Sequence, residues 1–238
     1  MPNKTHTTDN ATNYTHTTHY SVIAIDGPSA SGKGTIAKRV ANRLHFSYLD
    51  SGAIYRTVAL YVLKNKLAKD IPNNINEIAS AINTYIDLSF IDDNVYLNNV
   101  DVTNQIRTED VGMMASTIGK YPSIRTALLH LQRDFALKDN LVTDGRDMGS
   151  VVFPNADLKV FLTAAQEKRA ERRYNQLVKT NDAVNFEDIL QDIITRDTQD
   201  SNRDVAPLMY TKDYKLLDNT YLTIEESVEE IINWFHGH

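Results

Sequence analysis

Apolar and polar residues follow two different periods along the chain, and each period predicts a different element. Residues 22–25 form a short apolar run that ends at Asp26, which is typical of a strand buried on both faces. Residues 33–44 place Ile36, Val40 and Leu44 four positions apart, which predicts a helix with one apolar face. The chain therefore begins its folded part as a strand, a glycine-containing loop and a helix.

The same order recurs further along the chain. A second apolar stretch, at residues 46–49, precedes a helical stripe through Ile54, Val58, Tyr61 and Val62. Strands alternating with helices predict an α/β fold of three layers around a central parallel sheet of about five strands. The remaining strands are predicted at residues 141–144, 158–162 and 215–218.

One segment departs from this alternation. Between residues 88 and 102 the apolar residues recur at period two, around polar turns at Asp92–Asn94 and at Asn98-Asn99. This pattern predicts a small antiparallel β insert. Three short strands bury little surface alone, so we expect them to pack on helices at residues 76–85 and 105–116, as a lobe capable of moving.

Composition narrows the class of protein. The 238 residues are 42% hydrophobic and 24% charged, which excludes wholesale disorder. A formal charge of −6 argues against bulk nucleic-acid binding, and the absence of cysteine excludes disulfides and thiolate chemistry. No apolar run is long enough to span a bilayer, so neither a membrane nor a nucleic acid is an expected partner.

The first 20 residues are rich in Thr, Asn and His and contain no apolar run and no arginine. This composition predicts a disordered tail rather than a signal or transit peptide, and residues 21–238 are then a single folded unit. We expect a cytoplasmic location.

A phosphate-binding loop follows the first predicted strand. Glycines at these spacings allow backbone N–H groups to converge on a phosphate, and the start of the following helix adds positive potential. Lys33 is placed to reach the β and γ phosphates of a nucleotide. The loop consists of Gly27, Pro28, Ser29, Ala30, Ser31, Gly32, Lys33, Gly34 and Thr35.

The loop departs from the usual pattern at one position. Gly34 follows the lysine where a hydroxyl residue is usual, and Thr35 comes one place later. We therefore expect Mg²⁺ as a cofactor held mainly by nucleotide phosphates and water, with no protein ligand assigned.

Arginines recur at places where a second anion could bind. Arg56 and Arg146 lie just past the predicted carboxyl ends of parallel strands, where open α/β sheets bind ligands. Their forked guanidinium groups suit phosphate oxygens. Two further groups of residues each share one face of a predicted helix: Arg169, Arg172 and Arg173, and Arg196, Asp200 and Arg203. The same spacing is also typical of a solvent-exposed helix face.

Few general bases accompany this cationic set. Only His45 and His130 lie away from the chain ends. A phosphate acceptor is already ionised at neutral pH and needs screening rather than a base. The pattern thus favours a small kinase that phosphorylates a monophosphate with ATP.

Four motifs give the chain a family resemblance. It resembles the bacterial cytidylate kinases, members of the nucleoside monophosphate kinase family, in GPSASGKGT (27–35), LDSGAIYR (49–56), TDGRDMGSVVFP (143–154) and RDTQDSNRDVAPL (196–208). The resemblance runs from about residue 22 to 234. It implies a P-loop NTPase-type fold and ATP-dependent conversion of CMP and dCMP to their diphosphates by a monomer.

The resemblance also implies an organisation and residue roles. It implies a core (about 21–65, 120–165 and 205–238), a monophosphate-binding region with the β insert (about 66–119) and a helical lid (about 166–204). Arg56, Arg146 and Arg203 match the family's contacts to the acceptor phosphate, Arg196 and Asp200 its ribose contacts, and Ser116, Arg125 and Asp147 its cytosine contacts. Ser51 and Tyr55 complete the set of substrate residues. Arg172 and Arg173 match the family's lid arginines better than Arg169 does. Asp144 ends its strand at a position where P-loop proteins often have an acid near magnesium.

The cytosine set agrees with the chemistry of the base. Cytosine offers an amino donor beside ring acceptors, which suits a carboxylate beside arginine and serine donors. Uracil would present an acceptor to Asp147, so rejection of UMP by roughly 10²-fold is expected.

Several alternatives stay open on the sequence. Ser116 suits a backbone hydrogen bond within its helix, Asp147 a simple ion pair with Arg146, and Asp144 a solvent-facing strand end. A kinase for AMP or shikimate would keep the loop but not the cytosine set. A module that uses ATP to switch a partner surface would bind ATP without acceptor-dependent turnover.

Overall fold

The computed structural model describes residues 20–91, 94–178 and 184–237. The predicted tail (1–20) and the first residues of the turn at 92–94 lie almost wholly outside this part of the chain. Across the three described ranges, no helix is long and apolar enough to cross a membrane.

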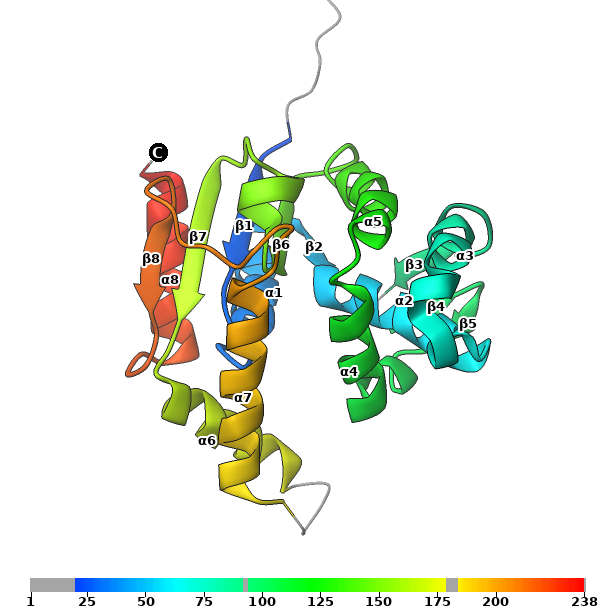
Figure 1. The fold of residues 1–238 in the computed structure, drawn as a ribbon. Coiled ribbons are helices and arrows are strands. Elements are labelled where there is room, and N and C mark those ends of the chain that lie inside the picture. The colour runs from blue at the N-terminus through cyan, green and yellow to red at the C-terminus, as the bar shows by residue number, and fades with distance from the viewer. Residues whose placement is uncertain (1–19, 92–93, 179–183, 238) are drawn as a thin grey trace, which may run out of the picture.

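Five parallel strands form the central sheet, which confirms the α/β prediction (Figure 1). The strands lie in the order β2-β6-β1-β7-β8, so β1 is central and its five residues are all buried. Each predicted strand is present within one or two residues of its expected bounds. The strands are β1 (Val22–Asp26), β2 (Ser47–Asp50), β6 (Leu141–Gly145), β7 (Leu158–Thr163) and β8 (Lys215–Asp218).

Helices cover both faces of the sheet and produce the three layers. Alternate residues of β1 face opposite layers: Ile23 and Ile25 pack with α1 (Lys33–Leu44) and α8 (Ile224–His236). Val22 and Ala24 pack with α2 (Ser51–Lys64) and α5 (Pro122–Phe135). Burial on both faces explains why β1 is continuously apolar rather than alternating.

The antiparallel insert is confirmed, as β3 (Leu88–Ile91), β4 (Asn94–Leu97) and β5 (Val100–Asp101). Its buried Leu88, Val95 and Leu97 belong to the same apolar cluster as Ile54 of α2. The insert therefore shares the core of the α2 side instead of having one of its own.

Two predicted helices beside the insert have different bounds. Instead of spanning 76–85, α3 covers Ile71–Thr84 after a short 3₁₀ helix η1 (Leu67–Asp70), because the Asp70 side chain caps its first turn and a proline follows. The helix expected at 105–116 is wrong as a single element. It is divided at Thr108, whose extended backbone (φ −67°, ψ 156°) separates η2 (Gln105–Arg107) from α4 (Glu109–Ile118).

A pair of helices, α6 (Gln166–Leu177) and α7 (Phe186–Ser201), extends beyond the carboxyl ends of the strands (Figure 1). The pair has a small apolar cluster of its own around Ala170, Ile189 and Ile193. A π-helical turn, η3 (Met148–Val152), follows β6 at the same edge of the sheet.

Candidate active site

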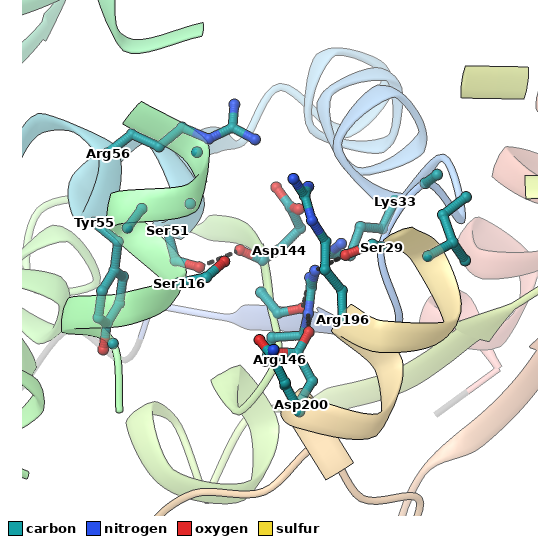
Figure 2. A pocket seen from close by; sticks show the side chains of 18 of the residues that line it. Ser29, Lys33, Ser51, Tyr55, Arg56, Ser116, Asp144, Arg146, Arg196 and Asp200 are labelled. Atoms are coloured by element: carbon teal, nitrogen blue, oxygen red, sulfur yellow. Dashed lines mark hydrogen bonds and ion pairs between the residues drawn. The ribbon is translucent and has the colours of Figure 1, made fainter. Parts of the chain in front are cut away.

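A polar cleft of about 450 Å³ opens at the carboxyl edge of the sheet. The phosphate loop lies on one side of it and α2 and α4 on the other, while α6 and α7 border it (Figure 2). Many of the residues singled out from the sequence line this cleft: Ser29, Ala30, Lys33, Ser51, Tyr55, Arg56, Ser116, Arg125, Asp144, Arg146, Asp147, Arg173, Arg196, Asp200 and Arg203.

The phosphate loop joins β1 to α1 as its spacing predicts. Gly32 has φ +90°, which favours glycine, and a Cβ atom on Gly27 would lie 2.0 Å from the carbonyl oxygen of Leu162. Among the described residues no side chain caps the start of α1, so its first N–H groups are available to an anion. The Lys33 ammonium donates to the carbonyl of Pro28 at 3.2 Å, and Thr35 lies exposed in the first helical turn.

Two carboxylates lie beside this lysine. Asp50 and Asp144 are register partners at the ends of adjacent strands β2 and β6. Burial, with a contribution from Asp50, raises the pKa of Asp144 to about 6. Burial and the nearby Arg146 lower the pKa of Lys33 to about 8. Asp144 is only 6% exposed and accepts a hydrogen bond from Tyr48 at 2.7 Å, so it is not a solvent-facing strand end.

Arg146, Asp200 and Arg203 form a linked group across the floor of the cleft. The Nε of Arg146 donates to Asp200 at 2.5 Å and its Nη2 donates to the Ser29 hydroxyl at 2.9 Å. Arg203 pairs with the other oxygen of Asp200, while its own Nε is buried without a partner among the described residues. An unpaired buried donor is costly, and a phosphate oxygen is the acceptor it lacks.

Arg56 extends from α2 toward the same space (Figure 2). Burial lowers its pKa, and Arg173, Arg196 and Arg146 lower it further. It makes no hydrogen bond or ion pair with any residue that the structure describes. The guanidinium groups of Arg56, Arg146, Arg173 and Arg196 lie near one another, and their ion pairs involve only two carboxylates, those of Asp200 and Glu109. The remaining positive charge attracts an anion.

The three residues expected at cytosine lie on separate elements. Arg125 of α5 pairs with Asp147 and donates to the Gly119 carbonyl at 3.1 Å, and its guanidinium lies 5.6 Å from the Tyr55 ring centroid. Asp147 therefore pairs with Arg125 rather than with its neighbour Arg146. Ser116 lines the cleft, and its hydroxyl makes no hydrogen bond within the described ranges, so it does not bond its own backbone.

The arginines of α6 face three different partners. Arg169 is 3% exposed and binds Asp197 at 2.6 Å and the Ser29 carbonyl at 3.0 Å, which fixes α6 on α7 and the loop. Arg172 does not line the cleft: it donates to the Ser31 carbonyl at 3.1 Å and to Asn219. Arg173 reaches across to Glu109 of α4, which Arg196 also contacts.

Sequence reasoning missed four residues in this arrangement. Asp50 could have been found, because it ends a strand at the same edge as Asp144. Glu109, Asp197 and Asn219 act only through pairing with distant arginines. No local pattern marks them.

Ser51 holds the floor of the cleft together. Its hydroxyl donates to the Asp144 carbonyl at 2.7 Å, so α2 begins against the end of β6. A Cβ atom on Gly145 would lie 2.6 Å from that hydroxyl oxygen, which explains the glycine in this close approach. The acceptor side of the cleft is thus tied to the strand that carries Asp144.

Comparison with known proteins agrees with this geometry. The sequence model of the cytidylate kinase family matches residues 23–237. A cytidylate kinase of Chromobacterium violaceum is 50% identical over 214 residues, which covers 90% of this chain and 95% of the relative. One from Neisseria meningitidis serogroup A is 49% identical, covering 90% of this chain and 96% of the relative.

Among solved structures, an uncharacterised protein from Eubacterium ventriosum matches with a TM-score of 0.52 at 13% identity, over 92% of this chain and 99% of that one. This likeness shows the fold alone. The family match spans nearly the whole folded part, including all four motifs, and the chain belongs to the cytidylate kinase family.

Proposed function

We propose that the protein transfers the γ-phosphoryl group of ATP to CMP or dCMP, giving ADP and CDP or dCDP. The observation that carries this proposal is one cleft in which a phosphate-loop lysine faces a group of arginines that includes the buried, unpartnered Nε of Arg203. Membership of the cytidylate kinase family supports the same substrates.

The arginines support a position for the acceptor phosphate at the cleft floor. A phosphate there would replace the missing acceptor of Arg203 and neutralise Arg56 and Arg146. One of its oxygens attacks the γ-phosphorus in line as the bond from that phosphorus to the β–γ bridging oxygen breaks, and ADP leaves. The acceptor is already ionised, so no side chain has to remove a proton.

The phosphate loop and helix α6 stabilise the transferring group. Lys33 and the free N–H groups at the start of α1 bind the β and γ oxygens. Helices α6 and α7 are the described part of the proposed lid (166–204, of which 179–183 lie outside the described residues). Their closure would hold Arg173 over the cleft and exclude water, which limits ATP hydrolysis. Residues of about 66–119 are proposed as the monophosphate-binding side, and those of about 21–65, 120–165 and 205–238 as the core.

Magnesium fits this site. Asp50 and Asp144 place two carboxylates side by side at the ends of adjacent strands, and burial, with repulsion from Asp50, raises the pKa of Asp144. These residues would hold Mg²⁺ directly or through its waters. When bound with ATP, the ion screens the charge on the β and γ phosphates.

Asp147 and Arg125 are proposed to select cytosine. One oxygen of Asp147 accepts the hydrogen bond from Arg125, and the other makes no hydrogen bond in the described part of the chain. That oxygen is available to the cytosine amino group, and Ser116 and Arg125 supply donors. Arg196 and Asp200 are proposed to contact the ribose. All these groups come from one chain, so we propose that the enzyme is active as a monomer. We propose a cytoplasmic location on the family resemblance of the chain.

The experiment is ADP release with Mg²⁺-ATP and each of CMP, dCMP, UMP, AMP and GMP, beside a reaction without acceptor. We expect CMP and dCMP to give strong turnover, with kcat/KM for UMP lower by roughly 10²-fold. ATP binding with no acceptor above the control would overturn the kinase proposal and favour an ATP-controlled switch. Turnover with AMP alone would assign a different acceptor.

A further inference from the structure

Asp26 lies outside the cleft, yet its side chain holds the segment that carries the substrate residues. It ends β1, is fully buried, and immediately precedes the phosphate loop. Its two oxygens accept the backbone N–H groups of Met148 and Gly149, each at 2.8 Å. The hydroxyl of Tyr214 donates to it as well, at 2.8 Å.

These two N–H groups are the first donors of η3, directly after Asp147. Asp147, the residue before η3, makes no side-chain cap in the part of the chain that the structure describes, and its backbone is neither helical nor extended (φ −144°, ψ 24°). The carbonyl of Asp147 in turn accepts Val151 and Val152 N–H groups at 2.9 and 3.1 Å. Asp26 thus caps a helical turn from a different strand and fixes the backbone on which Asp147 sits.

We propose that Asp26 is a positioning residue for substrate selection: by capping η3 across the sheet, it aims the Asp147 carboxylate at Arg125 and at the base. This inference rests on the proposed role of Asp147 at cytosine. Selection of a base by a buried polar group depends on placement within a few tenths of an ångström, so a loosened backbone costs discrimination before it costs binding of phosphates.

The chemistry of Asp26 suits this task. Burial raises its pKa to about 6, and the N–H bonds from Met148 and Gly149 oppose that rise. Each carboxylate oxygen accepts one of the two N–H groups, whereas in an amide an NH₂ group would replace one of these acceptors and would face an N–H donor. The start of η3 is also closely packed, because a Cβ atom on Gly149 would lie 2.7 Å from the Tyr214 hydroxyl oxygen.

The test is the ratio of kcat/KM for CMP to that for UMP in four variants, with folding monitored by thermal unfolding. In Asp26→Asn we expect this ratio to fall at least fivefold, while KM for ATP changes less than twofold. Asp26→Ser removes the charge with a smaller side chain and serves as a second variant should the first not fold. Tyr214→Phe removes one hydrogen bond from the same carboxylate but leaves both N–H contacts, so it should keep the ratio within twofold.

Asp147→Asn separates this inference from the proposed function. If that variant loses discrimination and folded Asp26 variants keep it, Asp26 is structural only and the inference is overturned. An unchanged ratio in Asp147→Asn would instead overturn the role of Asp147 at cytosine, and the inference with it. Amide hydrogen exchange at Met148 and Gly149 gives a local readout, and it should accelerate in both Asp26 variants but not in Tyr214→Phe.

Discussion

Arg203 presents a hydrogen-bond donor at the cleft that lacks an acceptor. Its Nε is buried without an acceptor in the described part of the chain, while its other end is held by Asp200. Burial lowers its pKa, so its charge is poorly solvated before substrate arrives. A bound acceptor phosphate would accept the Nε hydrogen bond and neutralise the charge. The free energy lost by burying this group in the free protein would then be recovered on binding, which increases the affinity for the acceptor.

Replacing this residue should therefore affect one substrate more than the other. In Arg203→Ala we expect KM for CMP to rise by roughly 10- to 100-fold, the loss of a charge-assisted hydrogen bond, while KM for ATP changes about twofold. The exposed Arg107 offers a matched control, and Arg107→Ala should leave both constants unchanged. Equal loss for ATP and CMP would contradict the assignment.

At the residue scale, sequence reasoning works where function is local. The phosphate loop is nine consecutive residues, so its glycine spacing alone indicates the turn and the approach to phosphate. The pairing of Arg146 with Asp200, 54 positions apart, depends on how α7 returns over the sheet. Residue types therefore identified the cations, but only the fold shows which acid each one meets.

At the scale of elements, Glu109 connects two parts of the molecule. It begins α4 and pairs with both Arg173 of α6 and Arg196 of α7. Both arginines are among those proposed to contact substrates. The carboxylate is half exposed and competes with substrate oxygens for the same donors, so it acts as an internal anion across the cleft.

Removing this competitor should strengthen nucleotide binding. Exposed ion pairs contribute about 0–1 kcal/mol each, so Glu109→Gln should lower the dissociation constants of CMP and ATP by about 2- to 10-fold in titration calorimetry. Asp110→Asn removes the same charge one residue away, on a side chain with no ion pair in the described structure, and should have a smaller effect. Weaker binding in Glu109→Gln would show instead that the pairs hold α6 and α7 in the binding arrangement.

The boundaries of an element were predictable where the sequence signals for its start and its end were both local. Helix α1 begins and ends at the residues that its apolar spacing predicts. The break at Thr108 was not predicted, because neither glycine nor proline marks it. Ile106 and Val111 are both buried, although five positions apart they would not share one face of a continuous helix. Tertiary packing of η2 and α4 onto α2 decides that the backbone turns there.

At the scale of the whole molecule, the active site reduces stability. Asp144 is buried and Lys33 half-buried, and loss of solvent raises the pKa of the acid to about 6 and lowers that of the amine to about 8. At neutral pH the unliganded protein therefore keeps charges in a setting that disfavours each of them. A site built to bind an anionic nucleotide with its cation is strained without them.

The sign of the pH dependence follows from Asp144. Its folded pKa of about 6 lies above the ordinary 3.8, so between these values the folded state binds more protons than the unfolded state. Its contribution to stability is thus fully present below about pH 3.8 and is lost as the pH rises through about 6. The shift corresponds to at most about 3 kcal/mol, since one pKa unit is about 1.4 kcal/mol.

Asp144→Asn should remove this dependence. The amide oxygen can still accept the Tyr48 hydrogen bond, but Lys33 loses a partner, so we expect the variant to gain about 1–2 kcal/mol over the wild-type protein between pH 4 and pH 7. Urea unfolding at each pH measures the difference, and the exposed Asp204, as Asp204→Asn, is the control. The same variant should lose most kinase activity, because the carboxylate beside the phosphates is gone. A stability difference that stays constant with pH would mean that Asp144 keeps its ordinary pKa in the fold, and would contradict the prediction.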